Sequence, residues 1–204
     1  MRKILSLLAC FSLLFAFGAS EAMAFGLGLA YNQGSGTSDI EADGVSIGEY
    51  DFDTSDIGLV MDTNLSMDST FNYRLTLTSA SAEYGNNLVF DDLSGFTMTH
   101  DFGFGIVKQP GFRLWMGPEL RLSWISGDGN TGLSELDVFS FGLGPVLGGN
   151  INIGETFTIA LTASYLFQTT NGDAWDNFGV YRDWSTDEKM LFVGLNLIMR
   201  LNEY

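Results

Sequence analysis

The sequence is poor in the residues on which disulfides, metal sites and nucleophilic catalysis depend. Its 204 residues include one cysteine, one histidine and three prolines. Basic residues are also scarce, at nine Lys and Arg against 25 Asp and Glu, which gives a formal net charge of −16. This charge excludes nucleic-acid binding through the neutralisation of phosphates. Beyond the N-terminal segment no apolar run approaches roughly 18 residues, so the sequence predicts no transmembrane helix.

The N-terminal segment has the features of a cleavable export signal. A basic Arg-Lys pair precedes an almost unbroken apolar stretch over residues 4–17, which is shorter than the roughly 20 residues that a spanning helix needs. Ala-Met-Ala at residues 22–24 fits the small-x-small pattern of a signal-peptidase site. We therefore predict a signal peptide at residues 1–24 and a mature domain at residues 25–204.

Two alternatives concern the same segment. An uncleaved membrane anchor is disfavoured by the short apolar stretch. A lipoprotein is suggested by Leu-Leu-Ala-Cys at residues 7–10, which resembles a lipobox, although the apolar sequence continues well past Cys10. The predicted mature domain contains no cysteine, so it forms no disulfide, and this is compatible with an oxidising periplasm.

Glycine and phenylalanine are abundant instead, with 25 and 17 residues, and apolar residues alternate with others along the chain. Between residues 191 and 201 every second residue is Leu, Val or Met. A period of two indicates a β-strand. Eight such segments lie at residues 25–32, 56–62, 71–82, 96–107, 112–125, 136–148, 156–168 and 191–201. The glycine and aromatic content suits a curved sheet with aromatic girdles.

The connections between the segments alternate in length. Long ones lie at residues 34–54, 83–94 and 169–188, short ones at 63–70, 109–111 and 149–155, and an intermediate one at 127–135. Outer-membrane barrels have short periplasmic turns and longer external loops. We therefore predict an all-β fold, an eight-stranded antiparallel up-and-down transmembrane β-barrel with both termini on the periplasmic side. A soluble barrel or sandwich is the alternative, which the glycine-rich, nearly uncharged second faces disfavour.

The chain resembles the small outer-membrane β-barrel proteins of the OmpA/OmpX type over residues 25–204. The resemblance lies in the signal peptide, the eight alternating strands and the length, and carries no catalytic motif. It implies a monomer in the bacterial outer membrane, inserted by the barrel-assembly machinery and in contact with outer-membrane lipid. It also implies a polar interior filled by side chains. Such proteins end on an aromatic residue in register with the lipid face, whereas Tyr204 falls one residue out of phase with Leu201.

Several charged residues have the inward parity of their predicted strands. They are Arg74, Asp101, Arg113, Glu119, Arg121 and Arg200. A three-residue hairpin with Gly111 in the left-handed position would pair Lys108 with Phe112. Asp101 would then face Glu119 across the two strands, with an arginine on the diagonal.

This inward set admits two interpretations. An eight-stranded barrel is just wide enough for its side chains to fill, and buried charges must be paired. We therefore expect an interior polar network of Arg74, Asp101, Arg113, Glu119 and Arg121 that closes the lumen. The alternative is a gated narrow pore lined by the same residues.

His100 is the only histidine, and its parity places it with Phe96 and Phe102 on the lipid face. The lipid A deacylases, which the chain faintly resembles, use a His-x-Ser pair on one strand. Here the residue two positions after His100 is Phe102, so the serine nucleophile is missing. We expect a structural histidine near an interface or a bulge. We assign no catalytic, cofactor-binding or metal residue and expect no enzymatic activity and no cofactor.

The long connections hold most of the acidic residues and four aromatic residues near the seventh turn. Asp-Gly-Asn at residues 128–130 is a weak calcium signal, because no loop has an EF-hand spacing. We expect a structural or surface-interaction role through the acidic loops, with a surface ligand as a candidate partner and no nucleic acid. A porin-like narrow channel for small solutes or ions is the alternative, and a lipid-modifying enzyme is a remote one.

Overall fold

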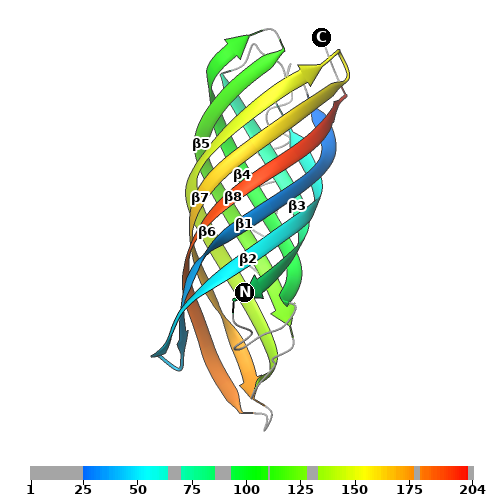
Figure 1. The fold of residues 1–204 in the computed structure, drawn as a ribbon. Coiled ribbons are helices and arrows are strands. Elements are labelled where there is room, and N and C mark those ends of the chain that lie inside the picture. The colour runs from blue at the N-terminus through cyan, green and yellow to red at the C-terminus, as the bar shows by residue number, and fades with distance from the viewer. Residues whose placement is uncertain are drawn as a thin grey trace.

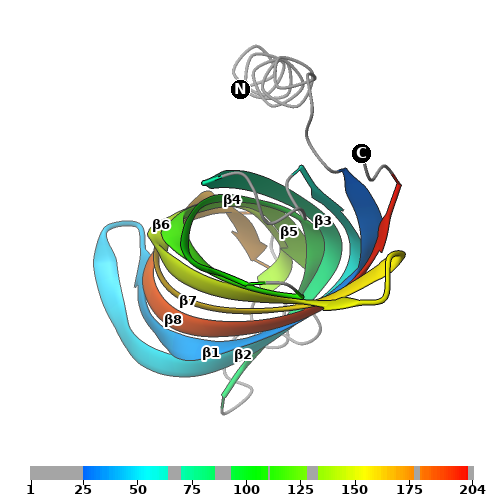
Figure 2. The same ribbon diagram turned by 90° about the horizontal axis from the view of Figure 1, so that it is seen from above.

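The computed structural model describes residues 25–63, 70–85, 93–109, 111–127, 133–176 and 180–201. This part of the chain forms eight antiparallel strands that close into one barrel (Figure 1). The strands are β1 (Gly26–Ala42), β2 (Val45–Asp62), β3 (Phe71–Tyr84), β4 (Leu93–Gln109), β5 (Phe112–Gly127), β6 (Leu133–Ile153), β7 (Phe157–Asp176) and β8 (Tyr181–Arg200). Each strand pairs with its neighbours in the sequence, as seen along the barrel in Figure 2. The predicted fold class is confirmed.

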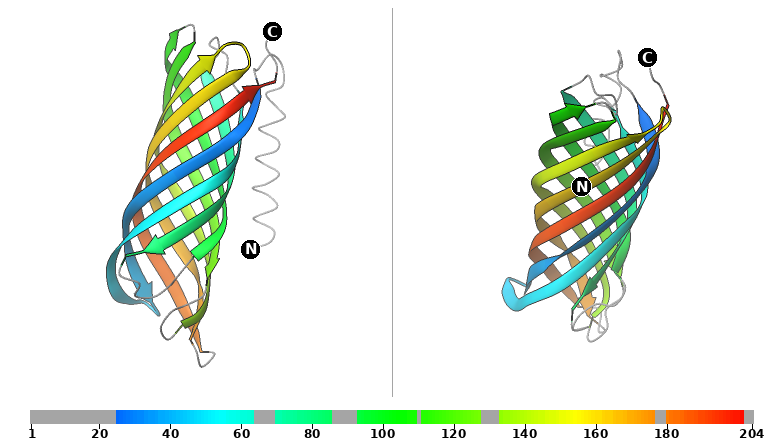
Figure 3. Two further views of the ribbon diagram at one scale, coloured as in Figure 1. Left: turned by 45° about the vertical axis from the view of Figure 1, so that its right-hand side comes forward. Right: turned by 45° about the horizontal axis from the view of Figure 1, so that its top comes forward.

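The ring closes between the first and the last strand. The β1–β8 register runs without a shift from Gly26 opposite Arg200 to Ala42 opposite Trp184. Beyond it the backbone N–H of Leu201 donates to the carbonyl of Phe25 at 2.8 Å. Both ends of the described chain therefore lie at one rim, which we call the terminal rim (Figure 3). The opposite rim, where β1 turns into β2, is called the hairpin rim.

The predicted signal peptide at residues 1–24, the Asp-Gly-Asn sequence at residues 128–130 and Tyr204 lie outside the described residues. Within the described ranges, no helix is long and apolar enough to cross a bilayer.

Two of the connections expected to be long loops are largely strand, so that expectation was wrong. β1 and β2 stay paired up to a two-residue turn at Asp43 and Gly44, whose φ angles are 50° and 73°, as a type I′ hairpin requires. β7 and β8 stay paired up to Trp175 opposite Tyr181. The alternation of apolar residues did not reveal these extensions, because it is present only where one face of a strand contacts lipid. Beyond the bilayer the backbone hydrogen bonds between strands continue, although the outward residues are no longer apolar.

The outward face of the barrel carries a continuous apolar belt. Leu29, Leu59 and Leu195 are 63%, 61% and 50% exposed, whereas Ala30 and Val60, which follow two of them in the chain, are buried inside. A soluble barrel would bury the leucines and expose the alternate residues. Such a belt is stable only against lipid, so the soluble alternative is contradicted.

Candidate functional site

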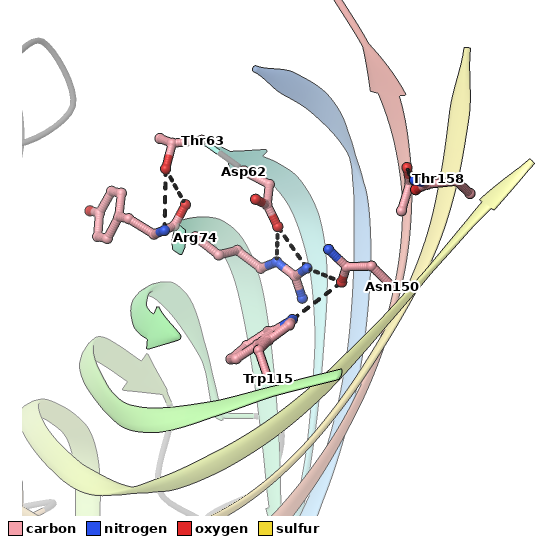
Figure 4. Close-up of polar contacts among 8 residues, drawn as sticks. Asp62, Thr63, Arg74, Trp115, Asn150 and Thr158 are labelled. Carbon is pink, nitrogen blue, oxygen red and sulfur yellow. Dashed lines mark hydrogen bonds and ion pairs between the residues drawn. The ribbon is translucent and has the colours of Figure 1, made fainter. Parts of the chain in front are cut away.

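One group of charged interior side chains lies near the terminal rim. Arg74 of β3 donates through Nε and Nη2 to Oδ2 of Asp62 on β2, at 2.9 and 2.7 Å (Figure 4). Its Nη2 also donates to Oδ1 of Asn150 on β6, at 3.0 Å. Trp115 Nε1 donates to the same Asn150 oxygen at 3.3 Å, and the guanidinium of Arg74 lies 5.1 Å from the centre of the Trp115 ring. These four side chains connect β2, β3, β5 and β6 across the lumen.

Trp115 is the largest fully buried side chain of this layer. Its ring occupies space that two inward glycines leave open. A Cβ atom on Gly148 of β6 would overlap the ring, and one on Gly103 of β4 would meet it closely. The lumen is filled at this level because the indole ring of Trp115 packs into the space left by glycines on the two adjacent strands.

A second ion pair lies closer to the hairpin rim. Nη2 of Arg121 on β5 donates to Oδ2 of Asp56 on β2 at 2.7 Å, and both side chains are at most 5% exposed. The guanidinium of Arg121 also lies 4.2 Å from the ring centre of Phe192 on β8. Because β2, β5 and β8 are not neighbours in the barrel, these contacts cross the lumen from wall to wall.

Asp101 of β4 and Glu119 of β5 lie between the two ion pairs and directly oppose each other in the ladder. They line a cavity of about 20 Å³, together with Arg74, Arg121 and polar side chains of β7 and β8. This volume suits a single water molecule. This part of the interior contains four buried carboxyl groups, because Asp56 and Asp62 add to Asp101 and Glu119. It contains three buried guanidinium groups, those of Arg74, Arg113 and Arg121.

The interior at the hairpin rim has a different character. A cluster of buried apolar side chains fills it, formed by Ile40, Ala82, Leu93, Leu136, Ala174 and Trp184. Beneath the cluster lies the buried carboxylate of Glu188, which accepts hydrogen bonds from Gln168 Nε2 at 2.6 Å, Thr186 Oγ1 at 2.8 Å and Tyr84 Oη at 3.2 Å. The cavity at this level measures about 30 Å³. The lumen is thus occupied by ionic pairs in one half and by an apolar core in the other.

The structure brings all five residues of the predicted network inside the barrel, where Arg74, Asp101, Arg113, Glu119 and Arg121 are at most 5% exposed. The predicted opposition of Asp101 and Glu119 is confirmed. The pairing predicted next to the turn was wrong. A register shift between Gly105 and Val107 places Gln109, and not Lys108, opposite Phe112.

The counter-charges of the arginines were missed in the sequence. Arg121 pairs with Asp56 and Arg74 with Asp62, and both aspartates come from β2. Their even parity, shared with the inward Val60, was the available signal. It was overlooked because the two aspartates mark the ends of the short segment that the apolar alternation defined. Arg200 lies at the terminal rim, where its guanidinium donates to the carbonyl of Gly154.

His100 alternates with the inward Asp101 and has the outward parity of the exposed Phe96 and Phe104, as predicted, but its own side chain is covered and only 5% exposed. Its Nδ1 is 2.7 Å from the hydroxyl of Tyr73 on β3. The ring is nearly parallel to that of Phe102, with ring centres 6.5 Å apart. This arrangement gives the histidine a polar partner within an aromatic cluster.

Comparison with known proteins locates the fold. No protein-family model matches the sequence, and no curated protein sequence matches it. Among solved structures, the outer membrane protein OprG from Pseudomonas aeruginosa has a TM-score of 0.65 at 13% identity, covering 90% of this chain and 98% of OprG. Neisserial surface protein A has a TM-score of 0.47 at 14% identity, covering 85% of this chain and 98% of that one.

The fold, the belt and the filled lumen agree with one another. Eight up-and-down strands form a closed ring, the outward face is apolar, and polar side chains, among them two ion pairs, are buried inside. The likeness to OprG covers nearly the full length of both chains. The protein is therefore an integral eight-stranded β-barrel of the bacterial outer-membrane type.

Proposed function

We propose that this barrel is sealed and non-catalytic, and that its function lies in the surface of the hairpin rim. The observation that carries the proposal is the double occupation of the lumen. Ion pairs around Arg74 and Arg121 cross one half, and the buried apolar cluster around Trp184 fills the other. A solute would have to break buried ion pairs and displace a packed core in sequence, and each step is costly.

The exposed acidic side chains support a role in surface contact. Asp39, Glu49 and Asp51 are exposed on the β1–β2 hairpin, and Asp137 and Asp183 are exposed on β6 and β8. They belong to rigid paired strands that extend past the apolar belt, so a partner would meet a preformed surface. In this proposal the barrel is a monomer surrounded by outer-membrane lipid, inserted by the barrel-assembly machinery.

The runner-up function is a narrow channel for small solutes or ions. The two cavities of about 20 and 30 Å³ lie in succession along the interior, and a rearrangement of the arginines that joined them would open a path.

Permeation separates the two functions. Liposomes that contain the purified barrel should not swell in iso-osmotic solutions of small sugars or amino acids, as for liposomes without protein. Liposomes that contain a general diffusion porin serve to show that the assay detects an open lumen. Swelling by the unaltered protein would replace the sealed barrel with the channel.

A further inference from the structure

Three aspartates form a continuous outward row across the hairpin rim. Asp137 of β6 opposes Asp173 of β7, and Asp173 opposes Asp183 of β8. Their chain neighbours Leu136, Ala174 and Trp184 are buried inside, so the three carboxylates lie on the outer surface. Like charges directly opposite in adjacent strands destabilise a sheet. A row of three therefore has a cost in stability that a cationic ligand would relieve.

Neighbouring groups hold this row in place. Tyr181 Oη lies 2.7 Å from Oδ1 of Asp173 and 2.8 Å from Oδ1 of Asp183, and these two carboxylates raise the pKa of the phenol. The backbone N–H of Asp183 donates to Oδ1 of Asp43 at 3.1 Å, and Arg182 donates to Oδ2 of Asp43 at 2.7 Å. Arg182 thus forms an ion pair with Asp43 of the β1–β2 turn.

The next outward row toward the membrane is partly aromatic. Trp124 of β5 opposes Phe139 of β6, and their ring centres are 5.2 Å apart. Phe139 opposes Asn171, which opposes Ser185. The aromatic row and the acidic row line one open groove of about 720 Å³, which reaches Gly44 at the tip of the β1–β2 hairpin. This volume lies within the range of ligand-binding clefts.

The chemistry of the groove selects its occupant. Aromatic faces and carboxylates together favour an organic cation, because ammonium and guanidinium groups bind both. Within the described residues, no three carboxylate, histidine or cysteine side chains are arranged to hold a metal ion. Anionic phosphates of lipid would be repelled by three carboxylates. The length of the groove across four strands suits an extended chain more than a single small cation.

We propose that this groove binds a basic amphipathic peptide segment of a partner protein. Its Lys or Arg side chains contact Asp137, Asp173 and Asp183, and its apolar side chains cover Trp124 and Phe139. The inference rests on the proposed surface role. It specifies the chemistry of the partner and the part of the rim that binds it.

Binding can be measured with the purified barrel in detergent and a fluorescent synthetic peptide of alternating lysine and leucine. The groove variant is Asp137→Asn, Asp173→Asn and Asp183→Asn. The matched control, Asp53→Asn, Glu83→Gln and Glu155→Gln, removes the same charge from exposed positions on β2, on β3 and in the turn after β6, all outside the groove. Fluorescence anisotropy should show binding that the groove variant weakens at least about tenfold and the control variant less than about twofold.

A second variant, Trp124→Ser, tests the aromatic row without a change in charge. It should also weaken binding, and a peptide with glutamate in place of lysine should not bind. Gel mobility of unheated samples verifies that each variant is folded. The proposal is overturned if the unaltered barrel does not bind the peptide, or if the groove and control variants lose affinity equally. Swelling of liposomes would contradict the sealed barrel and leave this binding result unaffected, so the two failures are distinguishable.

Discussion

Arg121 and Asp56 join opposite walls of the barrel, with Nη2 and Oδ2 2.7 Å apart. They belong to β5 and β2, which share no ladder, so the pair acts as a crosslink through the lumen. The ring of Phe192 on β8 covers the guanidinium from a third side. A sealed lumen depends on contacts of this kind, and single substitutions can test them.

Replacing Arg121 with Ala should destabilise the barrel by about 3–5 kcal/mol, because the carboxylate of Asp56 stays buried without its partner. The double variant Arg121→Gln, Asp56→Asn keeps the shape and removes both charges, so it should lose much less. Thermal or urea unfolding in detergent measures both. If the single and double variants unfolded alike, the pair would not hold the lumen together.

The packing of Trp115 against glycine can be tested by a double-mutant cycle. Gly148→Ala should cost about 1–3 kcal/mol in the unaltered protein, because the added methyl group overlaps the buried indole. In a Trp115→Ala background the same methyl group meets an empty space, and its cost should vanish. Equal costs in the two backgrounds, measured by unfolding, would show that the ring does not fill this layer.

The apolar belt predicts a dependence on depth. Leu161 is 50% exposed and lies near the middle of the outward apolar run of β7 from Phe157 to Phe167, so arginine there should cost about 2–4 kcal/mol in lipid. Ile153 is equally exposed but ends β6 next to the turn at the terminal rim, and arginine there should cost about 0–1 kcal/mol. Folding titrations in lipid vesicles compare the two. A loss that is the same at both depths would mean that this face does not contact a bilayer.

The contact of Asp43 with Arg182 predicts a pH response at the hairpin rim. The hydrogen bonds from Arg182 and from the backbone of Asp183 lower the pKa of Asp43. The stabilising effect is therefore complete above the ordinary carboxyl pKa and is lost as the pH falls through the lowered value. A carboxyl-selective NMR titration should find the midpoint of Asp43 below that of an exposed aspartate. Arg182→Ala should raise it, and an unchanged midpoint would exclude the contact in solution.

The alternating parity of the sequence predicted the barrel, its eight strands and the inward side of five charged residues. It succeeded because a bilayer imposes a period of two on each spanning strand. The opposition of Asp101 and Glu119 was predicted from a three-residue turn at Gly111, which does adopt a positive φ of 81°. The turn itself pairs Gln109 with Phe112, and the register shift between Gly105 and Val107 restores the predicted opposition. The register shift at Gly105 could not be predicted, because it corrects the pairing locally and leaves no mark in the pattern.

The ion pairs across the lumen could not be predicted from the sequence for another reason. Arg121 and Asp56 are separated by 65 residues, and by two intervening strands on one path around the barrel and four on the other. Which inward side chains meet across the lumen depends on the stagger of the closed sheet, which is a property of the whole ring. The groove beside Asp173 could not be predicted for a similar reason. Its acidic row consists of one residue from each of three strands, in the parts of those strands that extend beyond the apolar pattern.

The closed lumen is the central claim, and single-channel recording in planar bilayers tests it most directly. The unaltered barrel should give no conductance steps above the baseline, at either polarity, because ion pairs and an apolar core occupy its two halves. A general diffusion porin recorded under the same conditions should give clear steps. Steady, ion-selective steps from the unaltered barrel would contradict the account.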